Sequence, residues 1–149
     1  MKPFTNVEEA IDAADPLAPE WLPVGGRTEC NFFSAKVAKL MGAPLEGTAN
    51  EIAEHCETPA ALDQGYASAT EQVARQFCDA GGLAFAVWKN PDGHGHITPL
   101  TMAPPGKSGT WVANVGAHNH RRLPLLSAFG HRAVKFFTWH PRRASGLTP

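Results

Sequence analysis

The sequence predicts an α+β fold in which N-terminal helices pack on an antiparallel β-sheet. Up to Gly82, apolar residues recur at helical spacing behind capping signals, and from Leu83 onward the pattern changes to short apolar runs separated by turns. The length of 149 residues allows one hydrophobic core and is too short for two. We therefore expect a single domain over residues 1–149, composed of an N-terminal extension (1–25) and a core (26–140).

The clearest helix begins at Cys30. Thr28 is available as its N-cap, and Gly42 followed by Pro44 is a stop signal. A shorter helix is expected over residues 7–14. The apolar side chains of the Cys30 helix lie at the spacing of one buried face: Phe33, Val37, Leu40 and Met41.

Two further helices are expected where a Ser or Thr precedes a Glu by three positions, as Thr48 precedes Glu51 and Ser68 precedes Glu71. The second of these ends at Gly81 and Gly82. Beyond it, the expected strands cover residues 83–88, 96–102, 110–116 and 133–139, with 122–130 as a loop or short helix. Helices followed by a meander of this kind indicate α+β.

The composition predicts neither a transmembrane helix nor a Sec signal and leaves several kinds of partner open. The net charge is −1, yet residues 1–92 hold all fourteen acidic residues, whereas residues 93–149 hold seven Lys and Arg and no acidic residue. Such a basic segment suits nucleic acid, an anionic wall polymer or a carboxylate-rich peptide, unless the two halves neutralise each other in the fold. No run of 18 apolar residues predicts a transmembrane helix, and the acidic N-terminus lacks the apolar stretch of a Sec signal.

Three cysteines at irregular spacing do not form a disulfide framework, and one of them is a candidate nucleophile. Cys56 and Cys78 fall near the C-terminal ends of their helices, where the dipole opposes a thiolate, so we expect them to be buried space-fillers. Cys30 opens its helix, where backbone N–H groups and the positive dipole end lower a thiol pKa and can hold an oxyanion. Its alternative role is that of a small buried residue.

A thiol nucleophile needs an imidazole, and the GHGH stretch supplies the best candidate. His96 enters the strand and should point away from Ile97, whereas His94 lies in the turn and is expected to be solvated. Asn114 interrupts the apolar strand TWVANVG, so its amide is a candidate for orienting the imidazole. A Cys30–His96–Asn114 constellation follows. A zinc site at the two HxH pairs is the rival, although CxxC and HExxH spacings are absent.

At this point the residues resemble a known family. The segment TECNFFSAKVAKLMGAPLEGTANEIAEH is similar to the N-terminal half of NlpC/P60-like and CHAP-like cysteine peptidases, especially cell-wall amidases among type VI secretion effectors and phage-associated lytic enzymes. The resemblance runs from about Gly26 to Trp139. The matching features are Cys30, Phe33, LMGAP, Ala49-Asn50, His96 in GHI, and Asn114 in VANVG.

The resemblance implies a papain-like fold of the NlpC/P60 type and one bacteriolytic catalytic domain. Cys30 would be the nucleophile, His96 the base and Asn114 the orienting residue, with Asn119 as the alternative to Asn114. The implied reaction is hydrolysis of amide bonds in peptidoglycan stem peptides, without metal or cofactor. Pro99 departs from the family pattern, because it cannot donate to a ladder, and places this stretch at an edge or a bulge.

The same resemblance implies a stem-peptide partner, no nucleic acid and no membrane span, and leaves an immunity or carrier protein open. The protein would be made in the cytoplasm without a Sec signal and act in the periplasm or cell wall, reaching it through a secretion machine or a phage particle. Two other classes remain open. One is a papain-like acyltransferase or deamidase that acts on a protein, and the other is a non-catalytic binding module of the same fold.

Overall fold

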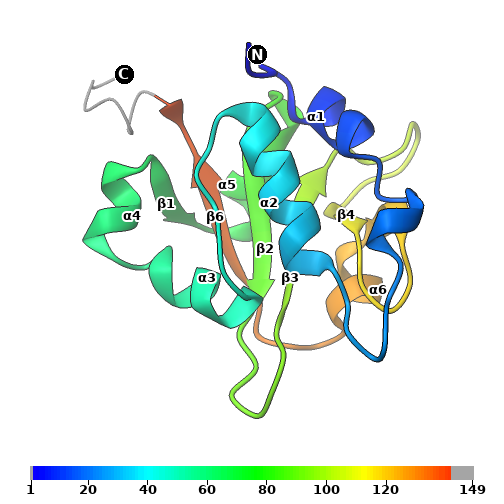
Figure 1. Cartoon of the computed structure of the whole chain (residues 1–149). Helices are drawn as coiled ribbons and strands as arrows, with labels where there is room; N and C mark the ends of the chain where they lie inside the picture. Colours follow the sequence, from blue (N-terminus) through cyan, green and yellow to red (C-terminus); the bar gives the residue numbers. More distant parts are fainter. Residues whose placement is uncertain (1, 142–149) are drawn as a thin grey trace.

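A computed structural model describes residues 2–141 and confirms an α+β architecture (Figure 1). Its helices are α1 (Val7–Ala14), the 3₁₀ turn η1 (Pro19–Trp21), α2 (Cys30–Met41), α3 (Ala49–His55), α4 (Pro59–Asp63), α5 (Glu71–Asp79) and α6 (Leu125–Phe129). Its strands are β1 (Tyr66–Ala69), β2 (Leu83–Trp88), β3 (His96–Thr101), β4 (Trp111–Asn114), β5 (His120–Pro124) and β6 (Lys135–Trp139). Within residues 2–141, no helix combines the length and apolarity needed to cross a bilayer.

All paired strands are antiparallel, in the order β1-β6-β2-β3-β4-β5. Strands β2, β3 and β4 follow one another as the expected meander, and it continues into β5, which was not expected as a strand. The expected last strand, β6, does not pair with β4 but returns to the free side of β2. Strand β1 is an unexpected addition, since its sequence YASA has no strong strand signal and its position is defined by pairing with β6. The expected loop or short helix over 122–130 divides into the end of β5 and α6.

Two of the predicted helix caps are wrong, although α2 begins at Cys30 as expected. Thr28 does not cap α2, because the N-cap is Glu29, which makes no side-chain cap bond. The cap of α5 is Thr70, whose hydroxyl accepts from the Val73 N–H, whereas Ser68 belongs to β1. Ser68 is unavailable as a cap because it pairs with Phe137 in the β1–β6 ladder. The stop at Gly42, with φ of 89°, and the Thr48–Glu51 capping box are confirmed.

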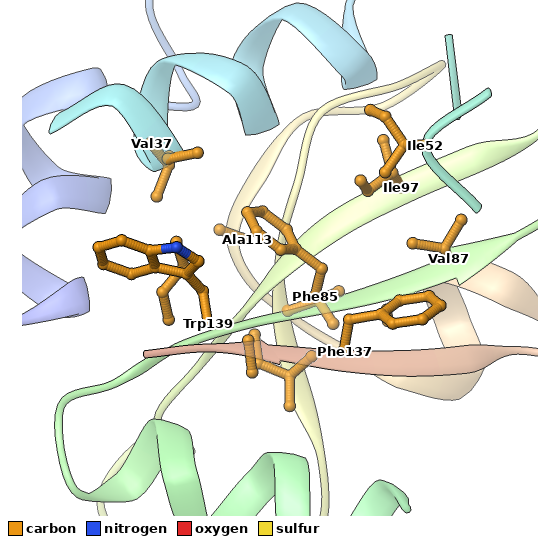
Figure 2. Close-up of a cluster of buried hydrophobic side chains, with 14 of the residues drawn as sticks. Val37, Ile52, Phe85, Val87, Ile97, Ala113, Phe137 and Trp139 are labelled. Atoms are coloured by element: carbon orange, nitrogen blue, oxygen red, sulfur yellow. The ribbon is translucent and has the colours of Figure 1, made fainter. Parts of the chain in front are cut away.

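The core lies mainly between α2, α3 and one face of the sheet. Figure 2 shows Val37 of α2 and Ile52 of α3 directed toward the sheet residues Phe85 and Ile97, with α5 on the opposite side. Helix α1 belongs to the same core although it lies in the stretch expected as an extension, since its apolar side chains are fully buried: Val7, Ala10 and Ile11. Helix α1 therefore packs against α2 as part of the core.

The start of α2 fits into a gap in the ladder between β3 and β4. These two strands pair only at Leu100 and Thr101, just beyond Pro99, which has no N–H to offer. Ahead of that point α2 contacts the free edge of β3, and the Ser34 hydroxyl donates to the Ile97 carbonyl at 3.5 Å. The gap brings the first turn of α2 beside the beginning of β3, where two of the candidate site residues lie.

Candidate active site

The histidine and the asparagine singled out from the sequence form a direct hydrogen bond. His96 Nε2 lies 2.8 Å from Asn114 Oδ1, and Asn114 Nδ2 donates to the His118 carbonyl at 2.7 Å. The second bond fixes which way the amide points, so its oxygen faces the imidazole and accepts from Nε2–H. Neutral His96 therefore carries its proton on Nε2 and keeps Nδ1 as the basic nitrogen. A register shift between Val112 and Asn114 in β4 helps to place the amide here.

The imidazole is also confined by packing. Its ring lies against the Phe129 ring of α6, with centroids 4.9 Å apart and planes at 49°. On another side it faces Gly116, where an added Cβ would lie 3.2 Å from His96 Cε1. Two walls and one hydrogen bond hold the ring in a single orientation, which is the arrangement expected of a positioned base rather than a solvated surface histidine.

Cys30 is the first residue of α2 and is only 5% exposed. Burial raises the pKa of its thiol above the ordinary value of 9.0. The Ile97 N–H, the Thr28 hydroxyl and the N–H groups of Asn31 and Cys30 itself oppose this shift, since they stabilise a thiolate, but they do not overcome the desolvation. The expectation of a lowered pKa from the helix N-terminus alone is therefore wrong, and Cys30 is a neutral thiol at rest.

Cys30 and His96 lie beside the same piece of backbone. The thiol is within hydrogen-bonding range of the Ile97 N–H, the residue that follows His96 in β3. Within residues 2–141 the structure records no direct hydrogen bond between the thiol and the imidazole. At rest the two groups are therefore a neutral thiol and a neutral imidazole on either side of the β3 backbone, rather than a formed thiolate–imidazolium pair.

Two surface cavities flank this pair and share Thr28 as a wall. The first, of about 620 Å³, is lined by Cys30 and by the exposed Phe32. The second, of about 430 Å³, is lined by His96 and Asn114. Two larger hollows, of about 790 and 880 Å³, have neither Cys30 nor His96 in their linings, so size alone does not identify the site. An extended chain crossing Thr28 would have one part in each of the two flanking cavities.

The pKa of the His96 imidazole is lowered from its ordinary 6.5. Burial is the main cause, because it disfavours the imidazolium, and the nearby Arg132 guanidinium acts in the same direction. The hydrogen bond to Asn114 acts against them and favours the protonated ring. The net result is an imidazole that stays unprotonated and available as a base at neutral pH.

Asn50, at the start of α3, positions the loop that leads into β3, a role that sequence reasoning missed. Its Nδ2 donates to the carbonyls of Asn90 and Gly93 at 2.8 and 2.9 Å, and its Oδ1 accepts from the Asn90 N–H at 2.8 Å. These bonds tie the β2–β3 loop to α3 and thereby fix the residues just ahead of His96. The signal available in the sequence was an Asn in the first turn of a helix together with a Gly-rich loop.

Gly95 lies where this clamp leaves no room for a side chain. A Cβ at Gly95 would lie 2.3 Å from the Trp88 carbonyl oxygen and 2.5 Å from Asn50 Oδ1. Gly95→Ala is therefore expected to lower the free energy of unfolding by about 1–3 kcal/mol, measured by urea denaturation. Gly93→Ala is the control, because its Cβ meets nothing closer than Asn90 Nδ2 at 3.6 Å and should change little. Equal losses in the two variants would contradict the role of the clamp.

The remaining candidates lie elsewhere or have structural roles. Asn119 accepts from the Gly116 N–H at 2.9 Å and donates to the Trp21 carbonyl at 2.9 Å, so it supports the loop after β4 and does not contact His96. His94 is exposed, as expected. Cys56 and Cys78 are buried near helix ends, and burial raises the pKa of each thiol to about 12.

The rival zinc site does not assemble in the described part of the chain. Between residues 2 and 141, no three His, Cys, Asp or Glu side chains are grouped where they could hold a metal ion. His96, from the first HxH pair, bonds to Asn114, and His118, from the second, offers its backbone carbonyl to the same amide. Both histidine residues thus form hydrogen bonds with Asn114 at this position.

Comparison with known proteins does not add a family to this picture. No protein-family model and no curated protein matches the chain.

Proposed function

We propose that this protein is a cysteine amidase or endopeptidase that hydrolyses amide bonds in peptidoglycan stem peptides. The observation that carries the proposal is the His96–Asn114 bond of 2.8 Å, which leaves Nδ1 as the basic nitrogen, on the strand whose Ile97 N–H faces the Cys30 thiol at the start of α2. A buried imidazole with a fixed tautomer beside a cysteine at a helix N-terminus is the arrangement that thiol acyl transfer requires. The substrate class rests on the resemblance of the Cys30 and His96 segments to cell-wall amidases.

The reaction divides into acylation and deacylation. His96 Nδ1 takes the proton from the Cys30 thiol while the sulfur attacks the amide carbonyl, and N–H groups in the first turn of α2 stabilise the oxyanion. The imidazolium then returns its proton to the leaving amine as the C–N bond breaks. In the second half, His96 takes a proton from water as the water oxygen attacks the thioester carbonyl. The C–S bond then breaks, the acid product leaves, and the imidazolium returns its proton to the Cys30 sulfur. Asn114 holds the ring throughout.

Neutral resting groups are compatible with this cycle. The raised pKa of Cys30 and the lowered pKa of His96 both disfavour a separated ion pair in the free protein. A substrate that displaces water and brings the thiol against Nδ1 allows proton transfer to accompany attack. For the same reason, simple alkylation of Cys30 at neutral pH is expected to be slow in an active enzyme as well as in a non-catalytic module, so it does not separate the two.

The deciding experiment is muropeptide analysis of purified sacculi digested with the wild type, Cys30→Ala and Cys56→Ala. We expect new cleavage products from the wild type and from Cys56→Ala, and none from Cys30→Ala, because Cys56 is buried at the end of α3 and makes no part of the site. The product masses would name the bond. Products that persist in Cys30→Ala would contradict the proposed nucleophile.

If the wild type gives no products, two alternatives remain: an acyltransferase or deamidase that acts on a protein, and a non-catalytic binding module. A transferase or deamidase would then modify a protein acceptor in a Cys30-dependent manner, which mass spectrometry of candidate acceptors detects. A binding module would bind stem peptides or another ligand without changing them. The proposed substrate places the site of action in the periplasm or cell wall, which fractionation of producing or target cells would test.

A further inference from the structure

Within the part of the chain that the structure describes, Arg132 has no carboxylate partner, unlike three of the five Lys and Arg residues between 93 and 141. Between residues 93 and 141 the basic residues are Lys107, Arg121, Arg122, Arg132 and Lys135. Three of them pair with acidic residues of the N-terminal half: Arg121 with Glu8 and Asp12, Arg122 with Glu8, and Lys135 with Glu57. The described residues offer no such pair to Arg132 or Lys107. The two halves thus neutralise each other in part, and of the two residues without such a pair only Arg132 lines the His96 cavity.

Two contacts hold Arg132 beside the candidate base. Its Cζ lies 4.5 Å from the centroid of the Trp88 ring, and Nη1 donates to the Phe129 carbonyl at 3.0 Å. Trp88 is the direct cross-strand partner of His96, and the Phe129 ring packs on the imidazole. The two groups that hold the guanidinium are therefore also neighbours of His96.

The cavity that Arg132 shares with His96 has a cationic wall and no anionic one. It is lined by both residues and by Trp88, and no Asp or Glu is part of the lining. A guanidinium has five N–H donors, of which the Phe129 carbonyl engages one group. Stacking on Trp88 uses the face of the guanidinium and leaves N–H groups at its edge for an acceptor. A planar carboxylate is the ligand that matches such an edge.

We propose that Arg132 binds a carboxylate carried by the residue that leaves as the amine during stem-peptide hydrolysis. This inference rests on the proposed function. His96 must protonate the leaving amine, so the leaving residue occupies the cavity that His96 lines rather than the one beyond Cys30. Arg132 is a specificity residue in this role, and it distinguishes a carboxylate from a carboxamide at that position.

Binding of this carboxylate would also act on the base. The Arg132 charge is one cause of the lowered pKa of His96, after burial. A substrate carboxylate paired with the guanidinium cancels much of that charge, and the imidazole becomes more basic when the correct substrate is present. Substrate recognition and activation of the base are then linked through the same arginine.

The test compares stem peptides whose carboxylates are converted one at a time to carboxamides. We expect Arg132→Gln to lower kcat/KM for the peptide with a free carboxylate on the leaving residue by about 10- to 100-fold, the worth of a charge-assisted hydrogen bond. It should have little effect on the peptide amidated at that residue. Lys107→Gln is the matched control, because it removes one positive charge from an exposed loop that lines neither cavity. Arg132→Lys should recover part of the loss.

If Arg132→Gln lowers kcat/KM equally for both peptides, or for neither, the inference is overturned. The proposed function still stands in that case, provided that the wild type hydrolyses the peptides. If the wild type hydrolyses neither peptide, the proposed function fails, and calorimetry of the same peptides with Cys30→Ala and with Cys30→Ala/Arg132→Gln decides the inference separately. The inference is supported if the peptide with the free carboxylate binds more tightly than the amidated peptide, and if this difference disappears in the variant with Arg132→Gln. Equal binding of the free and amidated peptides would reject it.

Discussion

His96→Gln is expected to lower kcat/KM for stem-peptide hydrolysis by about 10³-fold, within the range that general acid–base catalysis supplies. The imidazole Nδ1 has two roles in the proposed cycle, since it accepts the Cys30 proton and later protonates the leaving amine. Glutamine fills similar space and can still donate to Asn114, so the hydrogen bond that now measures 2.8 Å is kept in kind while the basic nitrogen is lost. The measurement is a steady-state assay on a defined peptide.

His94→Gln is the matched control from the same GHGH stretch. Its side chain is exposed, lines the Cys30 cavity and has no bond to Asn114, so the change can alter KM, but kcat should remain of the wild-type order because the basic nitrogen of His96 is kept. Thermal unfolding of both variants would show that the fold is intact. Hydrolysis that survives in His96→Gln and disappears in His94→Gln would reverse the assignment of the base.

The pH profile of kcat/KM is expected to be broad, with an acid limb below 6.5 and an alkaline limb above 9.0, the ordinary values for His96 and Cys30. The active pair carries one proton, whether it lies on sulfur or on nitrogen. Burial lowers the pKa of His96, so the imidazole becomes protonated, and activity is lost, only in more acidic solution. Burial raises the pKa of Cys30, so a pair with neutral His96 loses its thiol proton only in more alkaline solution.

The same shifts affect stability. Because the pKa of His96 is lower in the folded chain than in the unfolded chain, its contribution is complete above about pH 6.5 and is lost as the pH falls through the folded value. The raised pKa of Cys30 gives a contribution that is complete below about pH 9.0 and is lost as the pH rises through the folded value.

Two asparagine variants test the origin of the acid limb. Asn114→Ala removes the hydrogen bond that favours the imidazolium, so the acid limb should move to lower pH while kcat falls because the ring is no longer held. Asn119→Ala removes bonds to Gly116 and Trp21 only, and should leave the limb in place. A limb that moves with Asn119→Ala and not with Asn114→Ala would contradict the assignment of the orienting residue.

Local sequence signals were sufficient where a structure is made by neighbouring residues. The Thr48–Glu51 capping box and the stop at Gly42 are each closed within a few residues, and both are confirmed. The apolar run of β2 is likewise recognisable without its partners. Strand β1 was missed because YASA has no such signal and becomes a strand only through its pairing with β6.

The candidate site shows the same division. The sequence alone determined that Cys30 opens a helix, that His96 enters a strand facing away from Ile97, and that a polar Asn114 interrupts an apolar strand. These are consequences of periodicity and capping, which act over a few residues. Only the tertiary structure decided that Asn114 rather than Asn119 bonds the imidazole, because the two residues lie at opposite ends of the β4–β5 loop and the fold alone determines which amide faces the ring.

Tertiary structure also reversed the expected charge state of Cys30 and selected Arg132 among the basic residues. A helix N-terminus favours a thiolate locally, but the free energy of burying a charge depends on everything packed around it, and here burial dominates. The seven Lys and Arg of the C-terminal segment are alike in sequence. Contacts between residues far apart in the chain decide which of the described Lys and Arg residues pair with carboxylates of the N-terminal half and that Arg132 lies beside His96. Those contacts exist only in the folded molecule.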